Sequence, residues 1–468
     1  MLLDIEQLDG NIKISYYDKD GKTQYKEYKV PHVGNWYVCS SKDPKASTEF
    51  ANWDGRPVKR IKDRKYDKYA MLQFIESLPE SDREQIFGYN FPKTYFVDIE
   101  VEVSDGFPEP ERADNPITTF AVVTPNRQCI VLATRNLSFE EQNKIQRDLD
   151  QYFEATGMKF NFSFKKFESE YDMVYTFLYE FVRKFPMMTG WNFIAFDWKY
   201  IINRSQKLGI DPSISSPSGS LWGKEKLPVH VGVLDYLELY RKWDRTVDIK
   251  ENYTLDWTAE KITGLKKIKY TGTLQDLYES DFEKYVYYNA VDTALVYLIH
   301  EKIKTMEIAL TIANICEISL YRASSPVAIT ESLLCKKFLK MGKVMATDQN
   351  KKKQERGGQY AGAYVKEPVV GMHRAVACFD FASLYPSIMR QINVSPDSFI
   401  KKVEVSKREA ERAEDRIVSV TGAVYKKEDS ILKDILTDLY TKRKVYKKKY
   451  FELLEEADKL EKDLKASK

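Results

Sequence analysis

The sequence predicts a multidomain α/β protein, and three observations support this fold class. The chain has 468 residues, a length that corresponds to about three domains of ordinary size. Between residues 94 and 200, short segments rich in β-branched and aromatic residues alternate with amphipathic helical patterns, as in an α/β sheet domain. Residues 275–345 have a mostly helical pattern, and one long charged helix is expected after about residue 428.

The first elements of this organisation can be placed from local patterns. Three strands are expected, at 94–103, 117–124 and 128–134. A helix follows them, because Ser138 with Glu141 three residues later forms a capping box. A second helix is expected over 170–184, where one face is apolar: Val174, Phe177, Leu178 and Phe181. A shorter helix is expected before the sheet, at YAMLQFIESL.

Composition restricts the class of protein. The chain is 43% hydrophobic and 31% charged, as in folded globular proteins. It contains no long uncharged apolar run and no signal-peptide pattern at its start, so no membrane segment is expected. The five cysteines are scattered without a CxxC pair, which argues against a disulfide framework or a zinc site. The scattered cysteines have the pattern of reduced core residues in a cytoplasmic protein. With four histidines, any metal is expected to have oxygen ligands, which favours Mg²⁺ or Mn²⁺.

Charge is balanced overall but clustered locally. The net charge is +3, from 73 Lys and Arg against 70 Asp and Glu, so the total neither favours nor excludes nucleic acid. Four basic stretches stand out: KRIKDRKYDK (59–68), KKIK (266–269), KKKQER (351–356) and KRKVYKKK (442–449). Each one alone is typical of a solvated face. Together, with tyrosines interleaved, they favour a surface that contacts phosphates.

Carboxylates in apolar surroundings give the first chemical signal. In YFVDIEVEV, Asp98 and Glu100 are two apart on a strand and therefore share a face, although an exposed polar strand edge would show the same pattern. Asp197 follows the apolar stretch GWNFIAF, and Tyr288 and Asp292 lie one turn apart on an apolar helix. Such aspartates are costly unless they bind a cation or are hydrogen-bonded. Only tertiary folding could bring them together.

These segments resemble, in order, spacing and residue type, the three motifs of the DEDDy 3′–5′ exonucleases. The resemblance implies a ribonuclease H-like exonuclease domain in which four carboxylates hold two Mg²⁺ or Mn²⁺ ions: Asp98, Glu100, Asp197 and Asp292. It also implies that the Tyr288 hydroxyl orients the attacking water. Phe196 is a candidate for stacking on single-stranded primer ends.

A second acidic motif lies in FDFASLYPSIM, residues 379–389. The pattern predicts a buried Asp380 at the end of an apolar strand, followed by a tight turn. The motif resembles the first palm motif of family B DNA polymerases. That likeness implies that Asp380 and the Phe381 carbonyl bind Mg²⁺, that the backbone around Ser383 and Leu384 holds a dNTP triphosphate, and that the Tyr385 ring excludes a 2′-hydroxyl.

The upstream loop YAGA adds a weaker signal for DNA contact. Tyr360 and Gly362 look like the family's template-tracking loop, although a plain turn remains an alternative. Stretches such as GAYVKEP and SLYPSIMRQINVSP resemble family B polymerases of the T-even bacteriophage type along essentially the whole chain. The segment from Asp197 to Leu234 looks short for that family, so its strand-separating hairpin is expected to be reduced.

The resemblance also implies domain boundaries. It places an N-terminal domain at 1–92, completed by about 305–351, an exonuclease at 93–304, the first part of a palm at 352–429 and a first fingers helix at 430–468. The family's second fingers helix and the D-T-D-S hairpin do not appear in the sequence. The expectation is therefore the N-terminal subunit of a split polymerase that extends a DNA primer–template with dNTPs. Its partner chain would carry the second palm aspartate, the second fingers helix and the thumb.

The last helix supports this expectation of a partner. Steps of four and three residues from Leu432 to Leu464 give an apolar seam like that of a coiled coil, with Arg443 as one interruption. Arg443 and Lys447 match the fingers positions that grip the incoming triphosphate. A homodimeric coiled coil with a solvated basic patch is the alternative for this helix. For the whole chain, the alternatives are a freestanding 3′–5′ exonuclease and a non-catalytic nucleic-acid-binding assembly protein.

Overall fold

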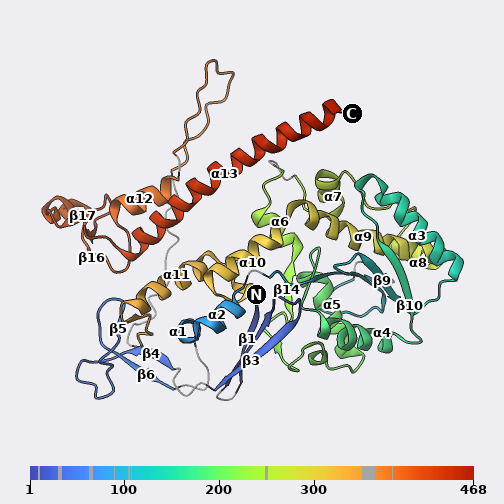
Figure 1. The fold of residues 1–468 in the computed structure, drawn as a ribbon, viewed down its shortest axis with the longest axis horizontal. Coiled ribbons are helices and arrows are strands. Elements are labelled where there is room, and N and C mark those ends of the chain that lie inside the picture. The colour runs from blue at the N-terminus through green and yellow to red at the C-terminus, as the bar shows by residue number, and fades with distance from the viewer. Residues whose placement is uncertain are drawn as a thin grey trace. The chain divides into compact units, whose positions relative to one another are not determined.

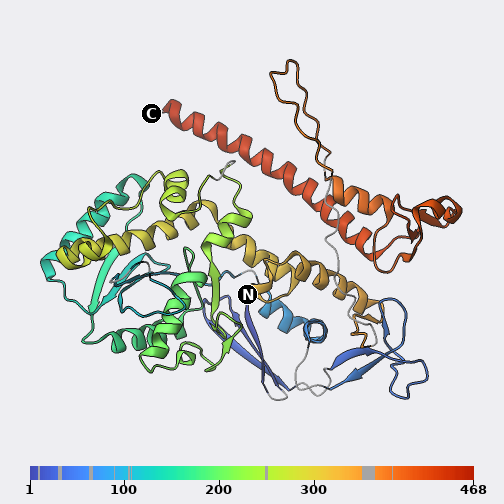
Figure 2. The same cartoon turned by 180° about the vertical axis from the view of Figure 1, so that it is seen from behind.

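A computed structural model describes most of the chain, shown from two sides in Figures 1 and 2. The described residues are 1–8, 11–29, 34–62, 67–88, 90–103, 106, 108–247, 251–349, 364–381 and 383–467. Tyr360 and Gly362, predicted to contact the template, lie outside them. The chain forms two compact units, one from 1–32 and 77–332 and one from 33–76 and 333–468. The finer domain boundaries implied by the resemblance remain predictions.

The first unit is built on a six-stranded sheet in the order β10-β9-β8-β7-β11-β14. Its strands are β7 (Thr94–Val101), β8 (Ile117–Val123), β9 (Gln128–Ala133), β10 (Asn161–Lys166), β11 (Met187–Gly190) and β14 (Gly232–Asp235). The three predicted strands are confirmed as β7, β8 and β9. β8 runs antiparallel to both neighbours, whereas β7, β11 and β14 are mutually parallel. The carboxyl ends of these parallel strands therefore meet at one edge of the sheet.

Both faces of this sheet are covered, which explains why β8 is buried along its whole length. Alternation along β7 sends Phe96 into the core shared with α9 (Phe282–Ile303) and α3 (Phe139–Phe153). Val97, Ile99 and Val101 enter the opposite core. Asp98 and Glu100 have the parity of Phe96 and so face α9. Figure 1 shows α9 and α3 running along the sheet.

The predicted helices of this unit are confirmed, with one irregularity. Ser138 and Glu141 form the expected capping box at the start of α3. The helix expected over 170–184 begins as α4 (Glu170–Thr176), passes through a π-helical turn (Phe177–Phe181) and ends in a 3₁₀ turn (Val182–Lys184). The remaining α-helices described in this unit are α2 (Glu80–Ile86), α5 (Lys199–Lys207), α6 (Tyr236–Trp243), α7 (Leu255–Thr263), α8 (Leu274–Ser280), α10 (Thr305–Cys316) and the first part of α11 (Pro326–Lys340), whose residues from 333 onward belong to the second unit.

Two smaller sheets complete the first unit. β1 (Leu2–Leu8), β2 (Asn11–Tyr17) and β3 (Thr23–Lys29) form an antiparallel meander. β12 (Leu221–Trp222) pairs with β13 (Leu227–Pro228) as a short hairpin. This hairpin lies in the segment from Asp197 to Leu234, where the sequence analysis expects a reduced strand-separating hairpin.

The second unit is a set of small sheets and helices. Its strands are β4 (Asn35–Val38), β5 (Ala51–Asn52), β6 (Val58–Ile61), β15 (Lys343–Val344), β16 (Phe399–Lys402), β17 (Arg416–Val418) and β18 (Ala423–Lys426). Its helices are α1 (Lys68–Ser77), which confirms the short helix expected there, α12 (Leu384–Ile392) and α13 (Ile431–Ser467). α13 is the predicted long charged helix, drawn in red in Figure 1. The helices of the described residues are all too short or too polar to span a lipid bilayer.

Candidate active site

Three of the predicted carboxylates converge at the edge of the six-stranded sheet. Asp98 and Glu100 project from β7 and Asp292 from α9, and one oxygen of each lies within 4.8 Å of the others. Asp98 and Glu100 are half-buried, whereas Asp292 is buried. Residues almost 200 positions apart in the chain are thus brought together by the packing of α9 on β7. The convergence that spacing alone could not establish is present.

Asp197 joins this group from a second element. It lies in a π-helical turn (Ile194–Trp198) that follows β11, and its Oδ1 accepts a hydrogen bond from the backbone N–H of Ile99 at 3.1 Å. The turn approaches β7 closely because Gly190 has no side chain: a Cβ there would lie 2.3 Å from the Val97 carbonyl oxygen. We name Asp98, Glu100, Asp197 and Asp292 the carboxylate cluster.

Two polar residues that the sequence analysis did not single out position the cluster. Asn289 donates through Nδ2 to Asp98 Oδ2 at 2.7 Å, and Thr119 donates to Asn289 Oδ1 at 2.9 Å, so the amide is held in one orientation. Asp235, at the end of β14, accepts from the backbone N–H of Ile194 at 3.0 Å and from that of Leu237 at 3.0 Å. It therefore ties the turn that carries Asp197 to the start of α6.

Lys267 provides a cation at the site. Its Nζ lies 2.5 Å from Asp292 Oδ2 and 4.9 Å from the centre of the Tyr288 ring. The sequence signal for it was the KKIK stretch, which was interpreted as a solvated or phosphate-contacting patch. Burial is the largest single influence and lowers the pKa of Lys267, but the electrostatic interactions with Asp292 and Tyr288 and the hydrogen bonds to them together outweigh it. The pKa is therefore raised, and the ammonium is retained.

Burial, followed by the crowding of negative charge, raises the pKa values of the cluster. Burial, and then the charge of Asp292, raises the pKa of Asp98 to about 7. Burial, and then the charges of Asp98 and Asp292, raises the pKa of Glu100 well above its usual range. Burial and the charge of Asp98 do the same to the pKa of Asp197. Burial and the charge of Asp292 also raise the pKa of Tyr288, which is therefore a neutral phenol at ordinary pH.

The donor set fits a divalent cation. The cluster offers carboxylate oxygens, which are the ligands that Mg²⁺ and Mn²⁺ prefer. The buried Oδ1 of Asp292 has no hydrogen-bond partner among the described residues, so a lone pair is left for a metal. A buried acceptor without a partner is costly, and a bound cation would remove that cost.

An open cavity of about 640 Å³ adjoins the cluster. Asp98, Asp292 and Lys267 line it together with Asn192, Trp191 and Tyr253. The aromatic side chains beside the carboxylates are thus Trp191, whose Nε1 donates to the Tyr253 carbonyl at 3.1 Å, and Tyr253 itself. Phe196, the residue proposed for stacking, is half-buried on the π-helical turn, with its ring centre 6.2 Å from that of Tyr200.

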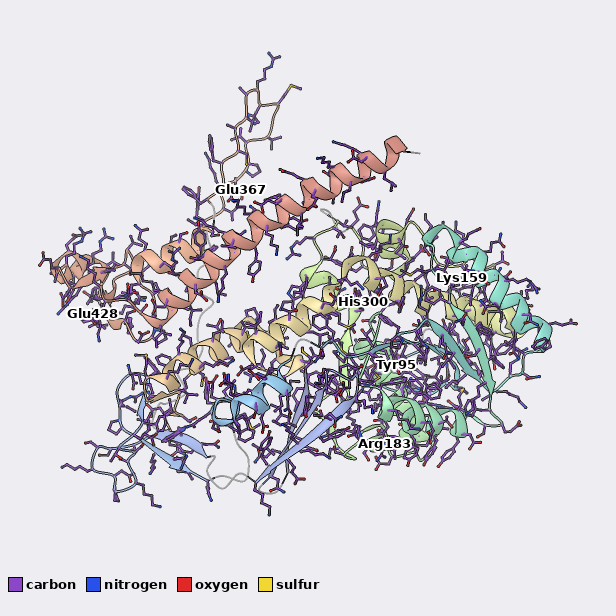
Figure 3. The ribbon with its side chains drawn as sticks, in the orientation of Figure 1. Tyr95, Lys159, Arg183, His300, Glu367 and Glu428 are labelled. Atoms are coloured by element: carbon purple, nitrogen blue, oxygen red, sulfur yellow. The ribbon has the colours of Figure 1, made fainter. Side chains whose placement is uncertain are left out.

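The environment of Asp380 differs from that of the carboxylate cluster. The prediction that Asp380 is buried at the end of a strand is wrong. Residues 364–381, which we name the extended segment, form neither strand nor helix, and Asp380 is exposed instead of buried. Figures 2 and 3 show this segment, and Figure 3 labels Glu367 on it. A strand needs a neighbour to pair with, and none of the described residues pairs with the extended segment. Its apolar side chains are exposed: Tyr364, Val365, Val369, Val370, Met372, Val376, Phe379 and Phe381.

The residues after Asp380 also differ from the expected turn. Ser383 has a left-handed backbone (φ 57°), and α12 starts at Leu384, so Tyr385 occupies the first turn of a helix and is 74% exposed. Arg443 reaches this region from α13, where its Nη1 donates to Ser383 Oγ at 3.4 Å. Lys447, one turn further along α13, lies over the ring of Phe451. The two predicted triphosphate contacts on Ser383 and Arg443 are therefore neighbours.

The apolar seam of α13 is exposed over much of its length. Near its start, Ile431, Leu432 and Ile435 pack with α11 residues. Beyond that, the seam residues are 47–69% exposed: Leu439, Tyr446, Tyr450, Leu453, Leu460 and Leu464.

Comparison with known proteins places these two sites in a family context. The model for DNA polymerase family B, exonuclease domain, matches residues 32–226, and that for DNA polymerase family B matches residues 316–467. The DNA-directed DNA polymerase of Escherichia phage RB69 is 25% identical over 493 aligned residues, covering 95% of this chain and 53% of that protein. The corresponding polymerase of Enterobacteria phage T4 is 25% identical, covering 96% and 54%. A DNA polymerase of Archaeoglobus fulgidus is 26% identical, covering 75% and 39%. The chain spans about half the length of the phage relatives.

Proposed function

Because the chain is homologous to family B DNA polymerases through both an exonuclease part and a polymerase part, we propose that it removes nucleotides from the 3′ ends of DNA and contributes half of a DNA polymerase site. The observation that carries the exonuclease proposal is the convergence of Asp98, Glu100 and Asp292, with Asp197 hydrogen-bonded beside them. DNA primer–templates and dNTPs are the proposed substrates, and the cytoplasm of an infected bacterium is the proposed location.

The geometry supports phosphodiester hydrolysis at the carboxylate cluster. When bound there, two Mg²⁺ or Mn²⁺ ions would activate a water and stabilise the leaving oxygen. The four carboxylates would hold these ions, and Asn289 would keep the Asp98 carboxylate in a single orientation. Tyr288, as a neutral phenol, can accept or donate a hydrogen bond and would orient the attacking water. The Lys267 ammonium would hold Asp292 in place and attract the scissile phosphate.

The polymerase part of the proposal rests on the second unit. Asp380 and the Phe381 carbonyl would bind Mg²⁺, while Ser383, Leu384, Arg443 and Lys447 would contact the triphosphate of a dNTP and Tyr385 its sugar. Phosphoryl transfer to a 3′-hydroxyl needs a second acidic residue to bracket the metal pair. We propose that a partner chain supplies it, together with the second fingers helix and the thumb. The exposed apolar side chains of the extended segment and of α13 support a further protein surface at these positions.

A freestanding 3′–5′ exonuclease is the second candidate function. It is favoured by the fact that the carboxylate cluster, Lys267 and the adjoining cavity are all contributed by the first unit. On that alternative, the second unit would bind DNA without contributing to synthesis.

Incubating the purified chain with an end-labelled primer–template and Mg²⁺ separates these functions. Degradation without dNTPs, with extension only after a complementing chain is added, supports the split polymerase. Degradation that no complementing chain converts to extension supports the freestanding exonuclease. Failure to degrade any 3′ end would contradict both and leave a non-catalytic DNA-binding role.

A further inference from the structure

A second cavity is lined in part by the turn that carries Asp197. It has a volume of about 320 Å³ and is enclosed by the π-helical turn, α5 and the β12–β13 hairpin. Three lysines line it, Lys199, Lys224 and Lys226, together with Asn203, Glu225 and Ala195. We name it the lysine pocket. None of its lysines belongs to the basic stretches that stand out in the sequence.

The hairpin wall of the lysine pocket is fixed to the protein core. The indole N–H of the buried Trp198 donates to the Lys226 carbonyl at 3.3 Å, and Leu227 is buried in the core beneath the sheet. Lys226 itself has a left-handed backbone (φ 51°), which turns the chain at the end of the hairpin loop. The lysines of the hairpin are therefore held by a backbone that is packed against the core. Ligand-binding sites are usually pre-formed in this way.

The charges of the pocket favour an anion. Three lysines against Glu225 leave a net charge of +2 on the lining. Lys199 is paired with Glu111, and Lys226 Nζ donates to Gln206 Oε1 at 3.3 Å. Lys224 is exposed and makes no ion pair or hydrogen bond with other described residues, so its ammonium is available to a ligand. A phosphate can accept from several ammonium groups at once.

The pocket is close to the carboxylate cluster along the backbone. Ala195, in the pocket lining, is two residues before Asp197, so the two Cα atoms are at most about 7.6 Å apart. On the other side of Ala195, Asn192 lines the cavity beside the cluster. Both Ala195 and Asn192 are exposed.

We propose that the lysine pocket binds a backbone phosphate of the single-stranded DNA whose 3′ end lies at the carboxylate cluster, a few nucleotides from the scissile bond. This inference rests on the proposed exonuclease function and adds a contact that the reacting nucleotide does not make. Lys224 and Lys226 contribute to affinity for longer strands, and Glu225 opposes it. The sequence of the strand is irrelevant to such a contact, because phosphates carry no sequence information.

The test begins with binding, independent of catalysis. The affinity of fluorescein-labelled dT12 is measured by anisotropy in EDTA over a range of salt concentrations, for the wild-type chain, Lys224→Ala, Glu225→Gln and Lys207→Ala. Lys224→Ala is expected to weaken binding about 2- to 5-fold and to reduce the slope of log K against log salt by about 0.7, the value for one lost phosphate contact on a single strand. Glu225→Gln is expected to tighten binding, which loss of folding could not produce. Lys207→Ala is the matched control and should leave the slope unchanged. Lys207 lies on α5, as Lys199 does, but it is paired with Asp114 and is outside the pocket lining.

Kinetics then locate the contact relative to the reacting bond. With Mg²⁺, Lys224→Ala should raise KM for dT12 while leaving the hydrolysis of thymidine 5′-(p-nitrophenyl phosphate), which cannot reach the pocket, unchanged. Equal effects of Lys224→Ala and Lys207→Ala on dT12 binding, or equal effects of Lys224→Ala on both substrates, would overturn the proposal. If the wild-type chain hydrolyses neither substrate, the proposed exonuclease function fails, while the anisotropy series still decides whether the pocket binds the strand.

Discussion

The two acidic sites of the chain contrast in how much of their surroundings the described residues supply. Around the carboxylate cluster, β7 is packed on both faces, α9 brings Asp292 to it, and Asn289 and Ile99 hydrogen-bond to its members. Around Asp380, the extended segment has no strand partner among the described residues, and its apolar side chains are exposed. The contrast teaches that an aspartate in an apolar sequence acquires a defined environment only when other elements pack around it.

The largest expected difference between the two sites is in the rate of backbone hydrogen exchange. Backbone amides of β7 around Asp98 are paired in the sheet and should exchange at least about 10³-fold more slowly than unstructured amides, since their opening requires a large part of the unfolding free energy. Peptides covering 364–381 should exchange with little protection. Comparable protection of both peptides in mass spectrometry would remove the distinction between the sites.

Replacing Asp197 and Asp380 by alanine, one at a time, tests whether they serve separate reactions. Asp197→Ala is expected to lower the rate of 3′-end degradation by more than about 10²-fold, because loss of a metal ligand should exceed the 10- to 100-fold typical of residues that only support ligands. Asp380→Ala should leave degradation unchanged and abolish any extension reconstituted with a complementing chain. Loss of both activities in Asp197→Ala, with normal thermal stability, would show that the two sites are not independent.

Removing the amide that orients Asp98 should have a smaller effect on the same reaction. Asn289→Ala takes away the 2.7 Å hydrogen bond to Asp98 Oδ2 and is expected to reduce degradation about 10- to 100-fold, or to raise the Mn²⁺ concentration needed for half-maximal activity by a similar factor. Asn314→Ala, in α10, is a control for loss of a buried asparagine outside the cluster. Equal activity of the two variants would show that the Asn289 bond does not position the metal ligand.

Truncating Asp235 should act on the turn that carries Asp197. Asp235→Ala removes the N-cap of α6 and the acceptor of the Ile194 N–H, which is expected to lower the free energy of unfolding by about 1–2 kcal/mol and to reduce degradation. Asp211→Ala removes the N-cap of the short 3₁₀ helix Pro212–Ser215, where Asp211 accepts from the Ser213 N–H and not from the turn, and should spare activity. The comparison is made by urea denaturation together with degradation rates, and an equal loss of activity in both variants would contradict the positioning role.

The smallest expected effect is on the pH dependence of stability alone. It is tested with two histidines, one in each region. Burial, and then the charge of Lys304, lowers the pKa of His300 to about 4, while the pKa of an unfolded histidine is about 6.5. The unfolded chain thus binds more protons between these values, so this group lowers stability as pH falls, by at most about 2 kcal/mol at pH 5. His300→Gln should flatten the fall in melting temperature from pH 7 to pH 5, whereas His373→Gln, in the extended segment, should not. Parallel curves for wild type and His300→Gln would contradict this; His300 is labelled in Figure 3.

Features set by local pattern were predictable from the sequence. Period-two alternation placed Asp98 and Glu100 on one face of a strand, the Ser138–Glu141 pair started α3, and the charged run after 428 became α13. Lys267, Asn289 and Asp235 were missed in the site because their roles arise from contacts between elements distant in the chain. KKIK has the composition of any solvated basic stretch, and only the fold places one of its lysines against Asp292.

The error at Asp380 has the complementary cause. The apolar residues before it have the composition of a buried strand, but burial requires a neighbouring strand and a packed face, and the described residues provide neither. Local composition therefore indicates what a segment can become, while its partners decide whether it does so.

Anomalous diffraction from crystals of the chain soaked in Mn²⁺ with a short single-stranded oligonucleotide tests the central claim most directly. The account predicts two peaks, about 4 Å apart, in contact with Asp98, Glu100, Asp197 and Asp292. Mn²⁺ bound elsewhere on the chain with no anomalous density among these four carboxylates would contradict it.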